Sequence, residues 1–166
     1  YEEEAKAIAR LFAEVGEAYA YLISEATPEV MGPVEALLDV CRYPDMEVCS
    51  VSFNFWHRLS YILSSGKKPH SLKWEGPALP EQEAQRRLDA FCPSFKRLVE
   101  ILSRRIEYPV DWDGWHRDEK NDFKYNRMVV GDLLLDSTDV LGADACMSVL
   151  TAPLSELSSN VRAGGT

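Results

Sequence analysis

Apolar residues recur at helical spacing along almost the whole chain, and this periodicity limits the possible folds more than any other feature. Between residues 8 and 23, large apolar side chains follow one another at intervals of three, four and seven residues. Such a stripe is typical of a helix that buries one face. The stripe consists of Ile8, Leu11, Phe12, Val15, Tyr19, Leu22 and Ile23. No segment alternates convincingly at a period of two, so the sequence predicts an all-α fold.

Prolines and glycines divide the periodic segments into six helical regions. Breaks fall before Pro28 and at Pro44, because proline disfavours helical geometry at the residue before it. Asp45 is placed to cap the helix at about 46–64, which is apolar around most of its circumference and should be covered on more than one side. Pro93 should start a new helix or kink the region at 82–107, and Gly142 suits a helix C-cap.

The six regions arrive as three antiparallel helix pairs within residues 1–158. A single pair cannot bury both of its faces, whereas stacked neighbours can. The pattern alone leaves two architectures open, an α–α superhelix of about three stacked pairs and a compact six-helix bundle. The expected pairs are 1–42, 46–107 and 121–157, with exposed loops at about 65–81 and 108–119 and a frayed tail at 159–166.

The charge balance limits the kinds of partner. The 166 residues carry 18 basic and 27 acidic side chains, a formal net charge of −9. Phosphate backbones and anionic lipids repel such a surface, so we expect neither nucleic acid nor membrane as a direct partner. A basic protein partner fits the charge, although acidic balance also serves solubility alone. The first residues resemble the interior of a helix rather than a signal peptide, so we expect a piece of a longer protein.

No catalytic or metal-binding pattern is present. The four cysteines lie inside apolar helical stretches, which indicates reduced, buried thiols, and neither they nor the three histidines have the spacing of a zinc site. The triplet at 116–118 matches the start of a kinase catalytic loop. That loop requires an asparagine five residues after its aspartate, where this chain has Phe123. We expect no enzyme activity, no metal and no cofactor.

Two segments contain candidate partner-binding residues. Acids and tryptophans are interleaved between residues 107 and 122, and carboxylates beside aromatic rings suit arginine-rich ligands. The alternative is a solvated loop whose tryptophans dock on the core. The helical region before it is basic, and its arginines either receive a phosphorylated or acidic ligand or neutralise neighbouring acids. The candidates are Asp111, Trp112, Asp113, Trp115, Asp118 and Glu119 in the first segment, and Arg97, Arg104 and Arg105 in the second.

Two strings carry a resemblance to a known family. Residues 53–59 read Phe-Asn-Phe-Trp-His-Arg-Leu, and residues 121–127 read Asn-Asp-Phe-Lys-Tyr-Asn-Arg. With their order and spacing from about Ala9 to Leu157, they resemble nuclear transport receptors of the importin-β superfamily, in the branch of transportin-SR and importin-13. The two loops depart from the family pattern in length or composition.

The resemblance implies a HEAT-repeat solenoid, which favours the superhelix over the bundle. It makes the aromatic-rich helix and the helix near Asn121 outer helices, and the basic region an inner helix. It also implies a receptor that shuttles between cytoplasm and nucleus and binds Arg/Ser-rich splicing factors as cargo, Ran-GTP and FG nucleoporins. The alternative is a helical scaffold unrelated to nuclear transport. A cut solenoid exposes apolar end faces, so we expect marginal stability or self-association.

Overall fold

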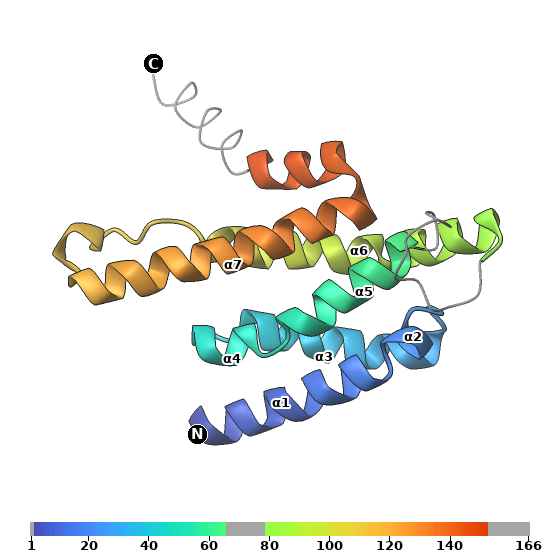
Figure 1. Cartoon of the computed structure of the whole chain (residues 1–166), viewed down its shortest axis with the longest axis horizontal. Helices are drawn as coiled ribbons and strands as arrows, with labels where there is room; N and C mark the ends of the chain where they lie inside the picture. The colour runs from blue at the N-terminus through green and yellow to red at the C-terminus, as the bar shows by residue number, and fades with distance from the viewer. Residues whose placement is uncertain (1, 66–78, 153–166) are drawn as a thin grey trace, which may run out of the picture.

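Every regular element that the structure describes is a helix (Figure 1). The structure is a computed structural model and describes residues 2–65 and 79–152. Most of the predicted loop at 65–81, the residues after 152 of the last helix, and the tail therefore lie outside the described residues. The elements are α1 (Glu2–Ala18), α2 (Ala20–Ile23), η1 (Pro28–Val30), α3 (Met31–Arg42), α4 (Met46–Ser50), α5 (Phe53–Ser65), α6 (Glu81–Arg105), η2 (Trp112–Gly114) and α7 (Arg117–Leu141). Residues 143–152 form a further helix.

The helices stack in two layers that repeat along one direction. Helices α1, α5 and α7 run the same way, and α5 contacts the other two; α3 and α6 run the opposite way and contact each other (Figure 1). Within the pairs, α1 contacts α3 and α5 contacts α6. Antiparallel pairs related by translation are the arrangement of an α-solenoid. The predicted all-α stack is therefore confirmed, with α5 and α7 in one layer and the basic helix α6 in the other.

The core is centred on α5 and α6 and is rich in aromatic rings. Trp56 packs edge-on against Phe55 and Phe95, with centroid separations of 5.1 and 5.5 Å, and all three side chains are fully buried. Such pairs contribute about 0.5–1.5 kcal/mol each beyond the area that they bury. Helix α5 also contacts α1, α2 and α7, so the expected cover on more than one side is confirmed.

Helix α1 packs through its small residues, and the predicted buried stripe is wrong. Six of the seven large side chains of the stripe, which runs from Ile8 in α1 to Ile23 in α2, are 38–64% exposed, and only Ile23 is buried. The buried face instead carries Ala9, Ala13 and Ala20 with Gly16, where a Cβ would lie 2.8 Å from the side chains of Leu37 and Phe55. Periodicity locates an apolar face but not its neighbour, and here the small face allows the closer backbone approach to α3 and α5.

The predicted helix at 46–64 is two helices. Asp45 caps α4 as expected, because its Oδ1 accepts a hydrogen bond from the Val48 amide at 3.1 Å. A turn at Val51 and Ser52 then separates α4 from α5. The Ser52 hydroxyl is buried and donates to the Cys49 carbonyl at 3.0 Å, which satisfies the backbone at the break. A side-chain bond of this kind competes with helical pairing, and periodicity does not reveal it.

Helices α6 and α7 differ from the sequence prediction in extent. Helix α6 runs through Pro93 as one continuous helix. Helix α7 begins at Arg117, four residues before the expected start, because the His116 amide donates to the Glu119 carboxylate at 2.8 Å in a capping box. Its expected end is confirmed: Gly142 has φ +82° and donates its amide to the Thr138 carbonyl at 2.8 Å.

Candidate partner-binding surfaces

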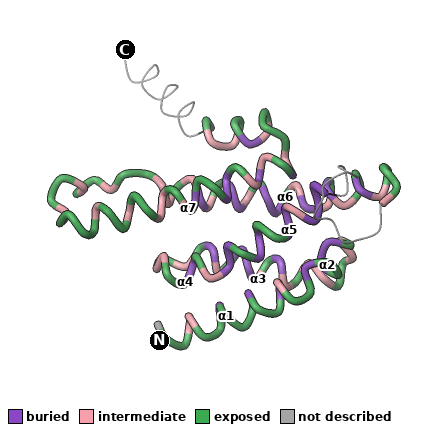
Figure 2. The backbone as a smooth tube through the Cα atoms, viewed as in Figure 1, coloured by how far each residue is buried: buried purple, intermediate pink, exposed green. Residues whose placement is uncertain are grey.

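The acidic and aromatic segment belongs to a part of the molecule that projects from the stack. Residues 107–129, here called the projecting lobe, comprise most of the α6–α7 connection and the first half of α7. None of these residues is buried, and they extend past the ends of α1 and α4 (Figures 1 and 2). Only at its inner end, at Val129, does the lobe pack against the hydrophobic core.

Four aromatic rings hold the lobe together. Trp112 lies 4.8 Å from Tyr108, 5.8 Å from Trp115 and 5.4 Å from Phe123 between ring centroids. Trp115 also packs edge-on against Phe123 at 5.8 Å. The tryptophans are therefore half-buried against each other and against α7, and not docked on the core as one of the two interpretations had it.

Two cations of the chain already occupy the rings. The Arg127 guanidinium lies 4.2 Å from the Tyr108 ring centroid, and the Lys120 ammonium lies 5.6 Å from that of Trp112. Lys120 also donates to the Asp113 carbonyl at 3.2 Å. The cluster is thus internally satisfied, and its geometry suits contact with positively charged groups.

The carboxylates of the lobe differ in whether they already accept a hydrogen bond within the molecule. Glu119 accepts the His116 amide at the start of α7, so it is a capping residue. Asp111, Asp113 and Asp118 are exposed, and their carboxylates have no hydrogen bond or ion pair among the described residues. Around the aromatic cluster, these three carboxylates are available to a cationic partner.

Most of the basic residues of α6 are bound within the molecule. Arg105 donates from Nε and Nη2 to the Cys41 carbonyl at 3.2 and 3.0 Å, and from Nη1 to the Pro44 carbonyl at 3.0 Å. It also donates to the Tyr43 carbonyl. Because Cys41 lies in the last turn of α3 and Tyr43 and Pro44 follow directly after it, these hydrogen bonds connect α6 to the end of α3.

Arg97 is also bound within the molecule, whereas Arg104 is not. Arg97 forms an ion pair with Glu35 of α3, and the hydrogen bond raises the pKa of Arg97. Arg104 is exposed and has no partner in the part of the chain that the structure describes. Of the three predicted arginines, two join neighbouring helices and one remains free.

The other end of α6 carries an ion-pair network within the helix, and one of its arginines also reaches the first helix pair. Glu83 accepts from both Arg86 and Arg87, and these hydrogen bonds lower its pKa to about 2. Arg86 also donates to the Glu25 carbonyl at 2.7 Å, just after α2. Most arginines of the basic face predicted from the sequence thus form contacts within α6 or with the first helix pair.

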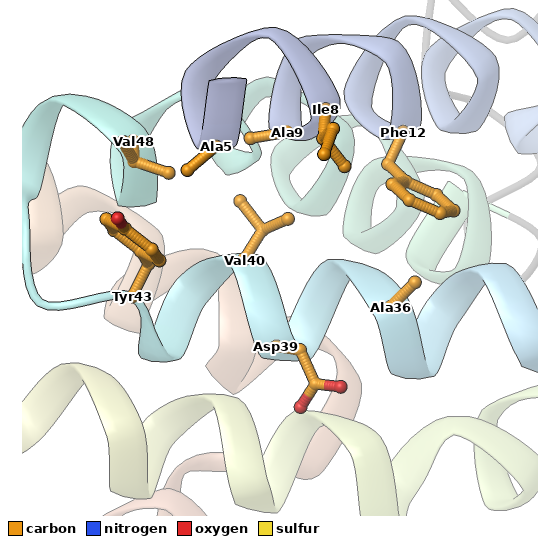
Figure 3. Close-up of a pocket in the computed structure, with 9 residues that line it drawn as sticks. All are labelled: Ala5, Ile8, Ala9, Phe12, Ala36, Asp39, Val40, Tyr43 and Val48. Carbon is orange, nitrogen blue, oxygen red and sulfur yellow. The ribbon is translucent and has the colours of Figure 1, made fainter. Parts of the chain in front are cut away.

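Sequence reasoning missed the outward face of α1, because it assigned those residues to the core. This face adjoins a groove of about 360 Å³ between α1 and α3 (Figure 3). The groove is lined by Ala5, Ile8, Ala9, Phe12, Ala36, Asp39, Val40, Tyr43 and Val48. The small residues at 9, 13, 16 and 20 were the available signal for the opposite face.

The described residues offer little for catalysis or metal chemistry. Within 2–65 and 79–152, no three His, Cys, Asp or Glu side chains are grouped to hold a metal ion. All four cysteines are free; burial raises the pKa of Cys146, and a hydrogen bond with Cys41 together with burial raises that of Cys49. A raised pKa keeps these two thiols unreactive, whereas hydrogen bonds with Cys49 and Ser52 lower the pKa of the buried Cys41 thiol. No described helix is long and apolar enough to cross a membrane.

Comparison with known proteins shows similarity to a family and to relatives whose names describe transport proteins. The family described as the Transportin-3/Importin-13 second TPR domain matches residues 1–74. TPR and HEAT units are both antiparallel helix pairs, so this match agrees with the observed stack. No solved structure matches the chain.

Three curated relatives match over most of the chain. Transportin MOS14 of Arabidopsis thaliana is 39% identical over 163 residues, which cover 98% of this chain and 17% of the relative. The mRNA transport regulator MTR10 of Saccharomyces cerevisiae is 28% identical, covering 84% and 13%, and the uncharacterized protein C11G11.07 of Schizosaccharomyces pombe is 26% identical, covering 92% and 16%. The chain thus spans less than a fifth of the length of each.

Proposed function

This chain belongs to the importin-β family of transport receptors, and from that premise we propose that its helix pairs recognise proteins during nuclear import. In this proposal the receptor binds Arg/Ser-rich protein cargo, Ran-GTP and FG nucleoporins and shuttles between cytoplasm and nucleus. It does no covalent chemistry. The observation that supports the proposal most is the similarity to Transportin MOS14 over 98% of the chain.

The projecting lobe is the part of this chain that we assign to cargo. Asp111, Asp113 and Asp118 are exposed and unpaired beside a cluster of aromatic rings. A guanidinium group gains an ion pair from a carboxylate and a stacking contact from a ring, as Arg127 over Tyr108 illustrates within the molecule. An arginine-rich segment is therefore the ligand class that the lobe fits.

The experiment is charge reversal in the intact protein. We expect Asp111→Lys/Asp113→Lys/Asp118→Lys to weaken binding of a labelled Arg/Ser peptide about tenfold or more at low salt, since each lost ion pair at an exposed site contributes modestly. The matched control, Glu4→Lys/Glu14→Lys/Asp144→Lys, makes the same charge change at exposed residues outside the lobe. Fluorescence anisotropy gives both affinities.

Two outcomes decide between the hypotheses. Equal losses in the two triple variants would reduce the effect to net charge and remove the lobe from cargo binding. If the intact protein bound neither Arg/Ser peptide nor Ran-GTP, the import role would fail and the scaffold hypothesis would replace it.

A further inference from the structure

Three arginines surround a small pocket where helices α3 and α6 end side by side. The pocket has a volume of about 280 Å³ and is lined by Arg42, Ile101, Arg104 and Arg105. Arg42 is the last residue of α3, and Arg104 and Arg105 are the last two of α6. In a chain with a net charge of −9, this concentration of guanidinium groups is a local reversal of charge.

The three guanidinium groups have different freedom. Arg105 is held by the carbonyls of Cys41, Tyr43 and Pro44. Arg42 donates from Nη1 to Asp39 Oδ1 at 2.6 Å and keeps about half of its side chain exposed. Arg104 is exposed and unpaired within the described ranges. The pocket lining therefore has two oriented cations and one free cation, and the carboxylate that partly neutralises Arg42 lies outside the lining.

Helix dipoles explain only part of this arrangement. Cations at helix C-termini offset the negative ends of the helices, and Arg105 does so directly through the carbonyls of α3. Arg104 donates to no carbonyl, and Arg42 turns to Asp39 instead of the helix end. Two of the three arginines are thus not used to cap a helix, yet both line the same concave surface.

We propose that this pocket binds the side-chain carboxylates of an acidic peptide segment that carries an apolar residue beside them. Guanidinium groups pair with carboxylates through two parallel hydrogen bonds. Orientation by neighbouring groups reduces the entropy lost when a ligand binds. Ile101 is half-buried and gives the pocket an apolar wall for the adjacent side chain. The proposal does not depend on the cargo assigned to the projecting lobe.

The test is fluorescence anisotropy with the intact protein and a labelled peptide that contains two adjacent glutamates next to a leucine. We expect saturable binding at low salt and a loss of about tenfold in Arg104→Ala, the size of one charged hydrogen-bonded contact. Lys96→Ala removes the same charge from an exposed residue of α6 outside the pocket and should change affinity less than twofold. Circular dichroism checks that both variants keep their helices.

Three peptide variants test the chemistry. Replacing both glutamates by glutamine should abolish binding, and a peptide whose only carboxylate is its C-terminus should bind at least tenfold more weakly. Tighter binding of a phosphoserine version would assign the pocket to phosphate and overturn the carboxylate assignment. Equal losses in Arg104→Ala and Lys96→Ala, or no loss in Arg104→Ala, would overturn the site itself.

Discussion

The outward face of α1 and the projecting lobe both expose large apolar side chains, but they do so in opposite ways. Along α1 and α2, six such residues form a stripe, and its first part lies beside an apolar groove. In the lobe, the rings contact one another, and carboxylates and two cations of the chain surround them. The α1 face therefore still requires an apolar surface to cover it, whereas the lobe is satisfied in water and suited to reversible recognition.

The largest effect should come from blocking the close approach of α1. Gly16→Leu places side-chain atoms where Leu37 and Phe55 already lie 2.8 Å from a Cβ position. We expect it to lower the free energy of unfolding by about 1–3 kcal/mol through overpacking, while the lobe keeps its aromatic contacts. Urea unfolding followed by circular dichroism measures the loss.

Gly131 provides the matched control for this variant. It lies inside α7 with open space around its Cβ position. Gly131→Ala should raise stability by about 0.5–1 kcal/mol, since alanine favours helix over glycine. A neutral Gly16→Leu variant would contradict the packing of α1 through its small residues.

An intermediate effect should come from the centre of the lobe. Trp112→Ala removes contacts with Tyr108, Trp115 and Phe123. These ring pairs contribute about 0.5–1.5 kcal/mol each at most, and none belongs to the buried core. We expect faster amide exchange at residues 108–123 with little change in global unfolding.

Hydrogen exchange with mass spectrometry separates the two possibilities for the lobe. If Trp112→Ala also accelerated exchange in α5 and α6, the lobe would be part of the core and the contrast with α1 would fail. Trp115→Ala is the companion variant, because it removes only two ring contacts and leaves Trp112 packed against Phe123.

The smallest effect concerns the ion pairs of Glu83 with Arg86 and Arg87, which lie within the first turns of α6. The folded-state pKa of Glu83 is lowered to about 2 by Arg86 and Arg87. A carboxyl group with a lowered pKa contributes stability above its unfolded pKa, about 4.3, and loses that contribution as the pH falls toward 2. Glu83→Gln should therefore flatten the pH dependence of unfolding between about pH 4.5 and 2.

The comparison variant for this prediction is Glu14→Gln, an exposed carboxylate without a partner among the described residues. It should leave the acid limb of the stability curve unchanged. If the free energy of unfolding had the same pH dependence in both variants, the ion pairs of Glu83 would contribute no measurable stability in solution, which is common for exposed ion pairs.

The sequence predicted the helices well and their neighbours less well. Periodicity and caps located α3, the start of α4 at Asp45 and the end of α7 at Gly142, because these depend on local geometry. Periodicity predicted the wrong buried face for α1, because a stripe of large apolar residues does not show which face of a helix contacts its neighbours. Continuous α6 through Pro93 and the break at Ser52 depend on tertiary contacts that override local preference.

For the candidate residues as well, local features could be predicted from the sequence and long-range contacts could not. The interleaved acids and tryptophans predicted an exposed loop at about 108–119, and they gave no sign that its rings would pack on Phe123. Arg97 and Arg105 were chosen for their charge, and their partners, Glu35 and the end of α3, lie about sixty residues away in the chain. Contacts at that separation follow from the stacking of helix pairs, which composition does not encode.

The most direct test of the account is the association state of this chain in sedimentation velocity experiments. We expect the chain to self-associate, and Leu11→Gln/Val15→Gln on the outward face of α1 to restore a monomer. Tyr125→Gln/Met128→Gln, on an equally exposed face of α7, should leave association unchanged. A monomeric unsubstituted chain, or association that persists in the α1 variant, would contradict an uncovered stacking face on α1.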